Sequence, residues 1–570
     1  MIIEQLERAL IGALESVGVE LPEGFQAKVE ASADLRFGDY QTNAAMVLAK
    51  RVRTNPRELA TKVVEAMQID DLAECSIAGP GFINFTVTMS AWGSAVSSLG
   101  KDERLGVPLA SPLQTVVLDF SAPNVAKPMH VGHIRSTIIG DSLARIARFL
   151  GHTVITDNHI GDWGTQFGMI IHGWKTVLDE QALEADPVTE LLRVYRTVNA
   201  QCGEDESIRE ICKQELVKLQ GGDADNLKIW ERCVELSKQG LQGIYDRLDV
   251  QFDYWYGESY YNERLAPLVD DMLEQGVARE SEGAICVFFD GEAKLKDKPT
   301  IIRKADGGFL YATTDLATID FRVEEWQADQ IWYVVGAPQQ LHFQQIFEAT
   351  RMRGQNPSMH HVAFGSILGE DRKLMKTRSG DNVQLIDVLD EAVERAAKAI
   401  EEKNPDLSGE EKDKVASIVG LGAVKFAELS QHRMTDYVFC WDRMLALQGD
   451  TAPYLQYSCV RVRSIFSKLD EGVKLDLGEL RIEADAEVHL ARMLVRFGEV
   501  VPSLLDDFRP NLLANYLLEL ARAFHSFFEA CPVLKSEGAT QNTRLVLCDL
   551  TSQVLVKGLG LLGIEVPERM

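Results

Sequence analysis

Apolar residues recur with two different periods along the middle of this chain. Short β-rich runs at 115–120 and 153–157 flank a helical pattern over 133–150. A strand, a helix and a strand over about forty residues predict a parallel βαβ unit, because parallel strands need a crossover connection of this kind. The α/β pattern resumes later, where we expect strands over 284–289, 300–303, 331–335 and 361–364 and a helix after Tyr311.

Helical periods dominate the rest of the chain. Residues 1–110 predict a small α+β unit, with helices over 2–17 and 56–68 and an alternating strand at 83–88. Residues 170–275 are almost continuously helical in pattern and interrupt the α/β region. From 384 onward the pattern predicts only helices, over 384–402, 410–430, 452–468, 484–506, 510–530 and 543–562. We therefore expect an α/β core with a helical insertion, followed by a helical bundle.

Composition and cysteine content indicate the class of the protein and its cellular location. At 570 residues the chain is too long for one core, and 46% hydrophobic with 25% charged residues is typical of globular proteins in water. No apolar run approaches the ~20 residues that a membrane helix needs, and the amphipathic start does not resemble a signal peptide. Nine scattered cysteines without a C-x-x-C pair predict reduced thiols, a cytoplasmic location and no tightly bound metal.

The net charge of −27 disfavours a nucleic-acid partner at long range. Binding to a polyanion nevertheless depends on local basic patches. Residues 351–380 hold six basic side chains against two acidic ones, and residues 454–468 hold three basic side chains and no acidic one. For any single stretch a solvated surface is the simpler interpretation. An RNA partner therefore stays open on charge alone.

The segment richest in chemistry is 119–133, where the first predicted strand of the βαβ unit ends and the helix begins. The turn carries Lys127, His130 and His133, with Gly132 near the helix start. Free N–H groups and peptide dipoles attract anions at a helix N-terminus, and imidazoles there can stabilise charge on a phosphate. The segment predicts a nucleotide-phosphate site, whereas H-x-G-H alone fits equally one packed and one surface histidine.

The segments 119–137 and 158–168 closely resemble arginyl-tRNA synthetases, a family of class I aminoacyl-tRNA synthetases. Further stretches that are similar to that family follow in order along the chain, at 37–43, 79–84, 311–315, 376–380, 454–457 and 567–570. The Lys-Met-Ser-Lys-Ser loop of class I enzymes is absent in that form, and residues 369–380 take its place. On composition alone, this segment would be a basic surface loop.

The resemblance implies a Rossmann-type class I catalytic core with a helical insertion, an N-terminal α+β tRNA-binding domain and a C-terminal all-α anticodon-binding bundle. The corresponding segments are an N-terminal domain at 1–110 that contacts the tRNA elbow, a catalytic core at 111–170 and 300–383, an inserted domain at 171–299, a helical connector at 384–445 and an anticodon-binding domain at 446–570.

The resemblance also implies an activity. ATP, brought with Mg²⁺, activates L-arginine as arginyl-adenylate, and the arginine is transferred to the 3′ end of tRNA(Arg), with activation that depends on bound tRNA. We expect a monomer with no membrane partner. The catalytic residues implied are His130, His133, Lys127, Lys376 and Arg378, with Lys127 standing in for a lysine missing from the 369–380 loop. The ATP contacts implied are Gly132, Phe364, Gly365, Ser366, Lys373 and Thr377.

A guanidinium is matched best by planar acceptors such as carboxylates. The resemblance implies arginine contacts at Asp119 and Asn124 for the α-amino end, Tyr311, Asp315 and Gln339 for the guanidinium, and His159 for the carboxylate. Tyr311 and Asp315 are four residues apart, which puts them on one side of a helix. Sequence alone does not exclude that Asp315 is an ordinary surface carboxylate.

Tyr454, Tyr457 and Arg461 share one face of a predicted helix and would suit stacking by unpaired bases. Periodicity alone favours a helix packed by its tyrosines. The resemblance implies that these residues contact the anticodon loop, together with Met570. It also implies elbow contacts among Phe37, Tyr40, Gln41 and Asn43.

Two alternatives to this hypothesis are another class I synthetase and a non-catalytic tRNA-binding protein. A class I enzyme for cysteine would hold zinc through thiolates, whose spacing is missing here, and one for glutamate would not suit a pocket with Asp119 and Asp315. A non-catalytic tRNA-binding relative is disfavoured because His130, His133 and Lys127 are all present.

Overall fold

The computed structural model describes residues 2–32, 34–369, 371–373, 375, 383–405, 407–469, 474–478 and 480–570. Its contacts divide the chain into two compact units. Unit 1 comprises Met1–Pro108, Tyr457–Ser503 and Asn515–Gly558, and unit 2 comprises Leu109–Gln456, Leu504–Ala514 and Leu559–Met570. The five segments expected from the sequence remain a prediction.

Unit 2 is built on a parallel sheet with the strand order β11–β10–β5–β6. Its strands are β5 (Thr115–Phe120), β6 (Thr153–Asp157), β10 (Gln330–Val334) and β11 (Ser358–His361). The predictions at 115–120, 153–157 and 331–335 are confirmed. The strand predicted at 361–364 is displaced, because this edge strand is made of the polar and only half-buried residues 358–361 and carries no apolar run.

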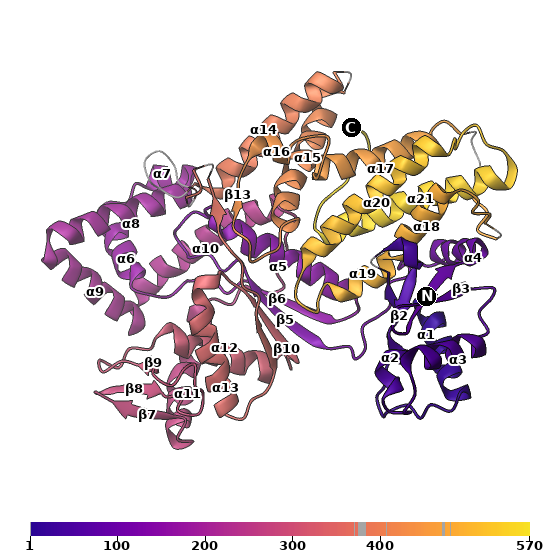
Figure 1. The fold of residues 1–570 in the computed structure, drawn as a ribbon. Coiled ribbons are helices and arrows are strands. Elements are labelled where there is room, and N and C mark those ends of the chain that lie inside the picture. Colours follow the sequence, from indigo (N-terminus) through magenta and orange to yellow (C-terminus); the bar gives the residue numbers. More distant parts are fainter. Residues whose placement is uncertain are drawn as a thin grey trace. The chain divides into compact units, whose positions relative to one another are not determined.

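Helices cover both faces of this sheet (Figure 1). Helix α5 (Gly132–Phe149) connects β5 to β6 on one face, while α12 (Tyr311–Glu324) and α13 (Gln340–Met352) lie on the other. This division follows from right-handed crossovers. The connection from β5 to β6 runs in one direction along the sheet, and the later connections to β10 and β11 run in the opposite direction. Open parallel sheets bind ligands where the winding reverses, so the carboxyl ends of β5 and β10 are the expected location of a site.

The insertion between β6 and β10 is less helical than predicted. It contains helices and a small antiparallel sheet, which are α6 (Gln166–Thr176), α7 (Glu180–Ala185), α8 (Pro187–Glu204), α9 (Glu206–Gln220), α10 (Ala224–Arg247), η2 (Glu258–Tyr261), α11 (Asn262–Glu274), β7 (Ala278–Ser281), β8 (Ala284–Val287) and β9 (Thr300–Arg303). Residues 248–257 are not helical, and Tyr254 forms a parallel bridge with Asp157 beside β6. The non-helical stretch 248–257 departs from the almost continuous helical pattern predicted for 170–275, whereas the strands predicted at 284–289 and 300–303 are confirmed as β8 and β9.

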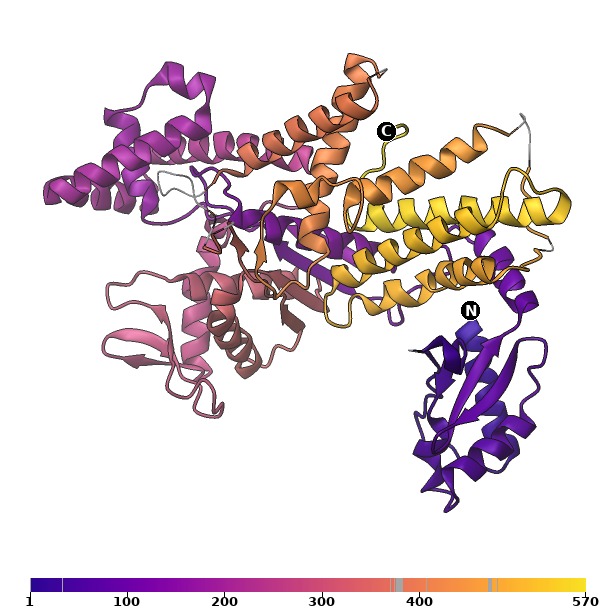
Figure 2. The ribbon, with the colours of Figure 1, turned by 45° about the horizontal axis from the view of Figure 1, so that its top comes forward.

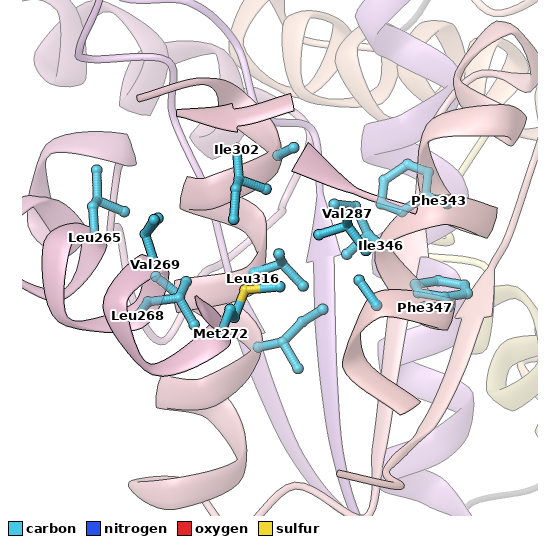
Figure 3. Packing of buried hydrophobic residues seen from close by; sticks show 14 of the residues in the cluster. Leu265, Leu268, Val269, Met272, Val287, Ile302, Leu316, Phe343, Ile346 and Phe347 are labelled. Carbon is cyan, nitrogen blue, oxygen red and sulfur yellow. The ribbon is translucent and has the colours of Figure 1, made fainter. Parts of the chain in front are cut away.

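One apolar cluster joins the insertion to the sheet. Side chains from α11, β8, β9, α12 and α13 pack together in it (Figure 3). Leu316 is fully buried, and Val117 of β5 belongs to the same cluster. The cluster fixes the start of α12 against the sheet, which matters because Tyr311 and Asp315 lie there.

Helices α14 (Leu385–Lys403) and α15 (Gly409–Leu429) confirm the predictions at 384–402 and 410–430. A short parallel pair, β12 (Ile367–Leu368) and β13 (Tyr437–Val438), lies outside the main sheet and was not predicted. The short helix α16 (Trp441–Met444) follows it.

Unit 1 contains an antiparallel sheet in the order β1–β2–β4–β3. Its N-terminal elements are α1 (Ile2–Ser16), β1 (Glu30–Ala31), η1 (Leu35–Phe37), β2 (Tyr40–Thr42), α2 (Ala44–Ala49), α3 (Pro56–Ala66), β3 (Ala73–Ala78), β4 (Phe82–Val87) and α4 (Met89–Gly100). The hairpin of β3 and β4 stands out within the indigo segment of Figure 2.

The C-terminal part of the chain is helical, as predicted. Its helices are α17 (Ala452–Phe466), α18 (Asp485–Val495), α19 (Phe497–Ser503), α20 (Pro510–Ala530) and α21 (Gly538–Leu561). The single helix predicted at 484–506 is interrupted at Arg496. No helix among the described residues is long and apolar enough to cross a membrane.

The contact between α5 and β5 has no space for a further methyl group. A Cβ on Gly140 would lie 2.2 Å from Cγ of Phe120. We predict that Gly140→Ala destabilises the protein by about 1–3 kcal/mol through overpacking, despite the better helix propensity of alanine. The measurement is the urea midpoint of unfolding.

Gly243→Ala in α10 is the matched control, because a Cβ there meets no atom within 4 Å. This variant should be as stable as the parent or slightly more stable. Equal stability of the two variants would show that the α5–β5 contact can relax.

Candidate active site

The ends of the parallel strands bring the predicted site segments together. Val334 pairs with Phe120, and Asp119 pairs with both Tyr333 and Asp157. Beyond the strands, single bridges continue the same edge and join Asn124 to Gly161 and Gly336 to Phe364. The segments that follow β5, β6, β10 and β11 therefore form one continuous edge.

The turn between β5 and α5 holds unusual backbone conformations. Ser121, Ala122 and Ala126 all have positive φ, between 44° and 70°. Such conformations cost energy in residues with a Cβ and need support from their surroundings. Three amides of the turn are held by side chains, because Ser136 Oγ, Asn158 Oδ1 and Ser237 Oγ accept from Ser121, Ala122 and Ala126 at 2.8–3.2 Å.

The two histidines of this turn lie against each other, with ring centroids 4.0 Å apart. The Nδ1 of His133 accepts from the His130 amide, and the Nδ1 of His130 accepts from the Gly132 amide, both at 3.1 Å. Burial lowers the pKa of His130, and burial together with His130 lowers that of His133 to about 4. Both rings are therefore neutral at pH 7, and with Nδ1 accepting, each carries its proton on Nε2.

Gly132 makes this arrangement possible, since a Cβ there would lie 2.8 Å from the ring of His130. The amide of Val131 donates to the carbonyl of Val383, and His130 bridges to Gln384, so residues 383–384 lie beside the histidines. Lys373 is exposed. Lys376, Thr377 and Arg378 lie outside the described residues.

Lys127 is half-buried, and its Nζ lies 5.1 Å from the centroid of the Tyr195 ring on α8. A cation over an aromatic face is weakly held. Lys127 therefore belongs to the same turn as the histidines, and its predicted part in activation remains a hypothesis.

A buried ion-pair network that sequence patterns did not predict occupies the carboxyl ends of β5 and β6. Arg322 of α12 is fully buried, and its Nη2 donates to Asp119 at 2.7 Å and to Asp157 at 2.9 Å. Burial raises the pKa of Asp157 against the effect of Arg322. One oxygen of Asp119 is thus engaged by the protein itself. The helix also carries Asp315, Asp320 and Glu324, so no sequence pattern singles out Arg322 as buried.

The predicted guanidinium contacts gather around the first turns of α12. Asp315 Oδ2 lies 2.5 Å from Nε2 of His342 on α13, and the Tyr311 ring lies 4.8 Å from the same imidazole. Tyr311 is 63% exposed, and Gln339 is exposed at the end of η3 (Ala337–Gln339). Asp315, Tyr311 and His342 therefore form a polar cluster beside the strand ends.

A second carboxylate, Glu258, lies in the same electrostatic environment and was missed by the sequence analysis. Burial, Asp162 and Asp315 raise the pKa of Glu258 to about 7, while His159 and the amide of Trp163 lower it. The residue is positioned by Asp162, which accepts from the amide and hydroxyl of Ser259 at 2.9 and 2.7 Å. A stretch that was assumed to be helical gave no signal for this residue.

His159 completes this group. Its Nδ1 lies 2.9 Å from the carbonyl oxygen of Tyr256 and must donate to it, because a carbonyl only accepts. Asn124, on the neighbouring segment, is exposed. Sequence-predicted residues and Glu258 thus combine into a site with several carboxylates.

The segment predicted to hold adenine, 364–366, is fixed by its backbone on two sides. Phe364 O accepts from the amide of Ala337, and the amide of Gly365 donates to Arg433 O at 2.9 Å. The amide of Ser366 donates to Asp436 Oδ1 at 2.5 Å. Phe364 is buried and Ser366 exposed, and these hydrogen bonds fix the segment beside the sheet edge.

The residues predicted to contact RNA differ in exposure. Phe37 is 50% exposed, Asn43 is exposed and Gln41 half-buried, whereas Tyr40 is 1% exposed and donates to Glu499 at 2.9 Å within unit 1. The Tyr40 ring is therefore not available for stacking, because the alternation of β2 turns it toward the core.

On the C-terminal helices, Tyr457 is 48% exposed and Tyr454 half-buried. The Arg461 guanidinium lies 4.5 Å from the centroid of the Phe528 ring. Met570 packs against an apolar cluster of α14 and α15 in unit 2. Tyr454, Arg461 and Met570 are thus partly packed within the protein. Their contacts with RNA, like that of Tyr457, remain predictions.

Among the residues that the structure describes, no group of three or more His, Cys, Asp and Glu side chains has the geometry of a metal site. The lack of a protein-bound metal remains a prediction.

Comparison with known families covers almost the whole chain. Residues 96–441 match the family "tRNA synthetases class I (R), catalytic domain", residues 455–570 the "DALR anticodon binding domain", and residues 3–87 the "Arginyl tRNA synthetase N terminal domain". The chain is 47% identical to an arginine–tRNA ligase of Aliivibrio fischeri over 98% of both chains. It is 46% identical to that of Thermobifida fusca over 94% of both.

Solved structures agree with these matches. The arginyl-tRNA synthetase of Plasmodium falciparum superposes with a TM-score of 0.84 at 27% identity, over 100% of this chain and 99% of the other. That of Thermus thermophilus shares the fold, with a TM-score of 0.82 at 24% identity over 100% of both chains. The predicted fold class is confirmed, and the chain belongs to the arginyl-tRNA synthetase family of class I aminoacyl-tRNA synthetases.

Proposed function

We propose that this protein is an arginine–tRNA ligase that activates L-arginine with ATP and transfers it to tRNA(Arg). The observation that carries the proposal is the pairing of two features at one sheet edge. Two neutral histidines with Nε2 protons lie at the start of α5, and the carboxylates Asp315 and Glu258 interact at the start of α12 and on η2. The first feature suits a phosphate and the second a guanidinium.

In the first step, a carboxylate oxygen of arginine attacks the α-phosphorus of ATP. The bond from that phosphorus to the β-phosphate oxygen breaks, and pyrophosphate leaves. His130 and His133 donate their Nε2 protons as hydrogen bonds to α-phosphate oxygens, on which negative charge grows in the transition state. Because both imidazoles are neutral, they act as donors and do not need to exchange a proton.

Arginine is held so that its carboxylate faces this phosphate. Asp315 and Glu258 accept from the guanidinium, with Tyr311 and Gln339 beside it, and Asn124 and Asp119 lie at the α-amino end. Arg322 pairs with Asp119 and Asp157 and offsets one of their two negative charges, while Asp315 and Glu258 attract the substrate. The backbone of 364–366 is assigned to adenine, and Lys127, Lys373, Lys376, Thr377 and Arg378 are assigned to the phosphates, whose charge Mg²⁺ partly neutralises.

In the second step, a hydroxyl of the terminal ribose of tRNA attacks the carbonyl carbon of the adenylate. An ester bond forms and AMP leaves, so no covalent enzyme intermediate is needed. The tRNA contacts come from the exposed Phe37, Asn43 and Tyr457, together with Gln41, Tyr454, Arg461 and Met570. A monomer in the cytoplasm and tRNA-dependent activation complete the proposal.

The direct test is charging of a tRNA mixture with a panel of labelled amino acids. We expect ATP-dependent charging with arginine alone. Charging with cysteine or glutamate and none with arginine would refute the proposal. Pyrophosphate exchange with and without tRNA checks the tRNA requirement, and exchange at full rate without tRNA would remove that part only.

Glu258 generates a prediction about pH. With a pKa raised to about 7, its carboxylate becomes protonated as the pH falls through 7 and loses its attraction for a guanidinium. We therefore expect kcat/KM for arginine to fall between pH 8 and pH 6. Glu258→Gln should have a raised KM for arginine at pH 8 and a flatter profile over this range.

The control is kcat/KM for ATP, measured at saturating arginine over the same pH range in both proteins. An identical arginine profile in Glu258→Gln would assign the titration to another group, such as Asp162, whose pKa is also raised by burial.

Replacing both histidines tests their assignment to the transition state. His130→Ala with His133→Ala should lower the rate of activation by at least about 100-fold, the usual effect of removing one oxyanion donor. tRNA affinity, measured by filter binding, should stay within about two-fold.

His172→Ala on α6 is the matched control, since this half-buried histidine lies outside the proposed site. It should retain the parent activity. Activation at the parent rate in the double variant would contradict the role given to the histidines.

A further inference from the structure

A buried polar cluster joins the helix that carries the histidines to the segment proposed to hold adenine. Its members are Arg135 on α5, Glu428 on α15 and Tyr437 on β13. Arg135 and Glu428 are each 1% exposed. We propose that Glu428 is a positioning residue for ATP, which fixes segment 364–366 relative to His130 and His133. This inference rests on the proposed function.

Arg135 forms the end of the cluster on the histidine side. It follows His133 by two residues on α5, and its Nε lies 3.1 Å from Oε2 of Glu428. Its Nη1 donates to the carbonyl of Thr435 at 3.0 Å, and its guanidinium carbon lies 5.5 Å from the centroid of the Tyr437 ring. Any movement of α5 therefore acts on the 435–437 segment through a rigid, planar group.

Tyr437 forms the end on the adenine side. Its hydroxyl donates to Oε1 of Glu428. Its backbone pairs with Ile367 in the β12–β13 ladder, and the preceding residue, Asp436, accepts from the amide of Ser366. One carboxylate thus holds the histidine helix with one oxygen and the neighbour of the adenine segment with the other.

The adenine segment has no freedom to move independently of this cluster. A Cβ on Gly365 would lie 2.6 Å from Oδ1 of Asp436 and 2.9 Å from the carbonyl oxygen of Met434. The backbones of 364–366 and 433–437 are therefore in tight contact along their whole length. A shift of Tyr437 passes directly into the groups that would contact adenine.

Stability alone does not explain such a cluster. Burial raises the pKa of Glu428 to about 7 against the effect of Arg135, so keeping this carboxylate ionised costs energy. Buried ion pairs are often no more stabilising than apolar replacements, whereas their fixed geometry can specify one arrangement. The described side chains that oppose the charge of Glu428 are Arg135 and the Tyr437 hydroxyl.

Glu428→Gln tests the proposal in the full-length protein. The amide keeps the size of the side chain but carries no negative charge to pair with Arg135 and has only one acceptor oxygen. In the aminoacylation reaction at saturating tRNA, we expect KM for ATP to rise about ten-fold and KM for arginine to change less than two-fold. A merely structural role would lower the melting temperature without separating the two KM values.

Tyr437→Phe is the second variant and covers the case in which Glu428→Gln fails to fold. It removes only the hydroxyl, and KM for ATP should rise about three-fold. The matched control is Glu487→Gln in unit 1, because Glu487 is also fully buried and accepts from Arg544 at 2.7 Å. It should leave KM for ATP unchanged.

An unchanged KM for ATP in Tyr437→Phe, or an equal rise of both KM values in Glu428→Gln, would overturn the inference. A parent protein that charges no arginine would instead refute the proposed function, so the two failures are distinguishable.

Discussion

The close contact between α5 and β5 is the constraint on which the rest of unit 2 depends. Gly140 of the helix lies against Phe120 of the strand with no room for a methyl group, so strand, turn and helix form one rigid piece. The strained turn at 121–126 can persist only because both of its ends are fixed in this way. From this piece come Asp119, Asn124, Lys127 and both histidines. A rigid support of this kind reduces the ordering cost when a substrate binds.

The acidic groups around this strand, turn and helix differ in the partners that they have. The chain carries a net charge of −27, yet at the sheet edge the acidic groups are sorted by partner. Asp119 and Asp157 share Arg322 inside the protein, whereas Asp315 contacts the imidazole of His342, and Glu258 is influenced by Asp162, Asp315 and His159. The negative charge of Asp315 and Glu258 suits a cationic amino acid. Residues 383–384, which follow the basic loop in sequence, lie beside Val131 and His130.

Much of this architecture could be predicted from the sequence, and the exceptions have physical causes. The strands 115–120 and 153–157 and the helix between them follow from periodicity, because buried parallel strands are apolar throughout. The edge strand at 358–361 was missed because exposed edges carry no such run. Arg322, Glu258 and Glu428 were missed because a buried charge is defined by partners far away in the chain. The alternation that buries Tyr40 becomes visible only once β2 has a neighbour in the sheet.

We propose above all that the carboxylates of Asp315 and Glu258, at the ends of the parallel sheet, select the guanidinium of arginine. Calorimetric binding of L-arginine and of L-citrulline to the full-length protein tests this most directly, because citrulline has the same shape and a neutral urea in place of the guanidinium. We expect citrulline to bind at least about 100-fold more weakly, since it leaves the half-buried carboxylates of Asp315 and Glu258 without a cationic partner. Equal affinity for the two amino acids would contradict it.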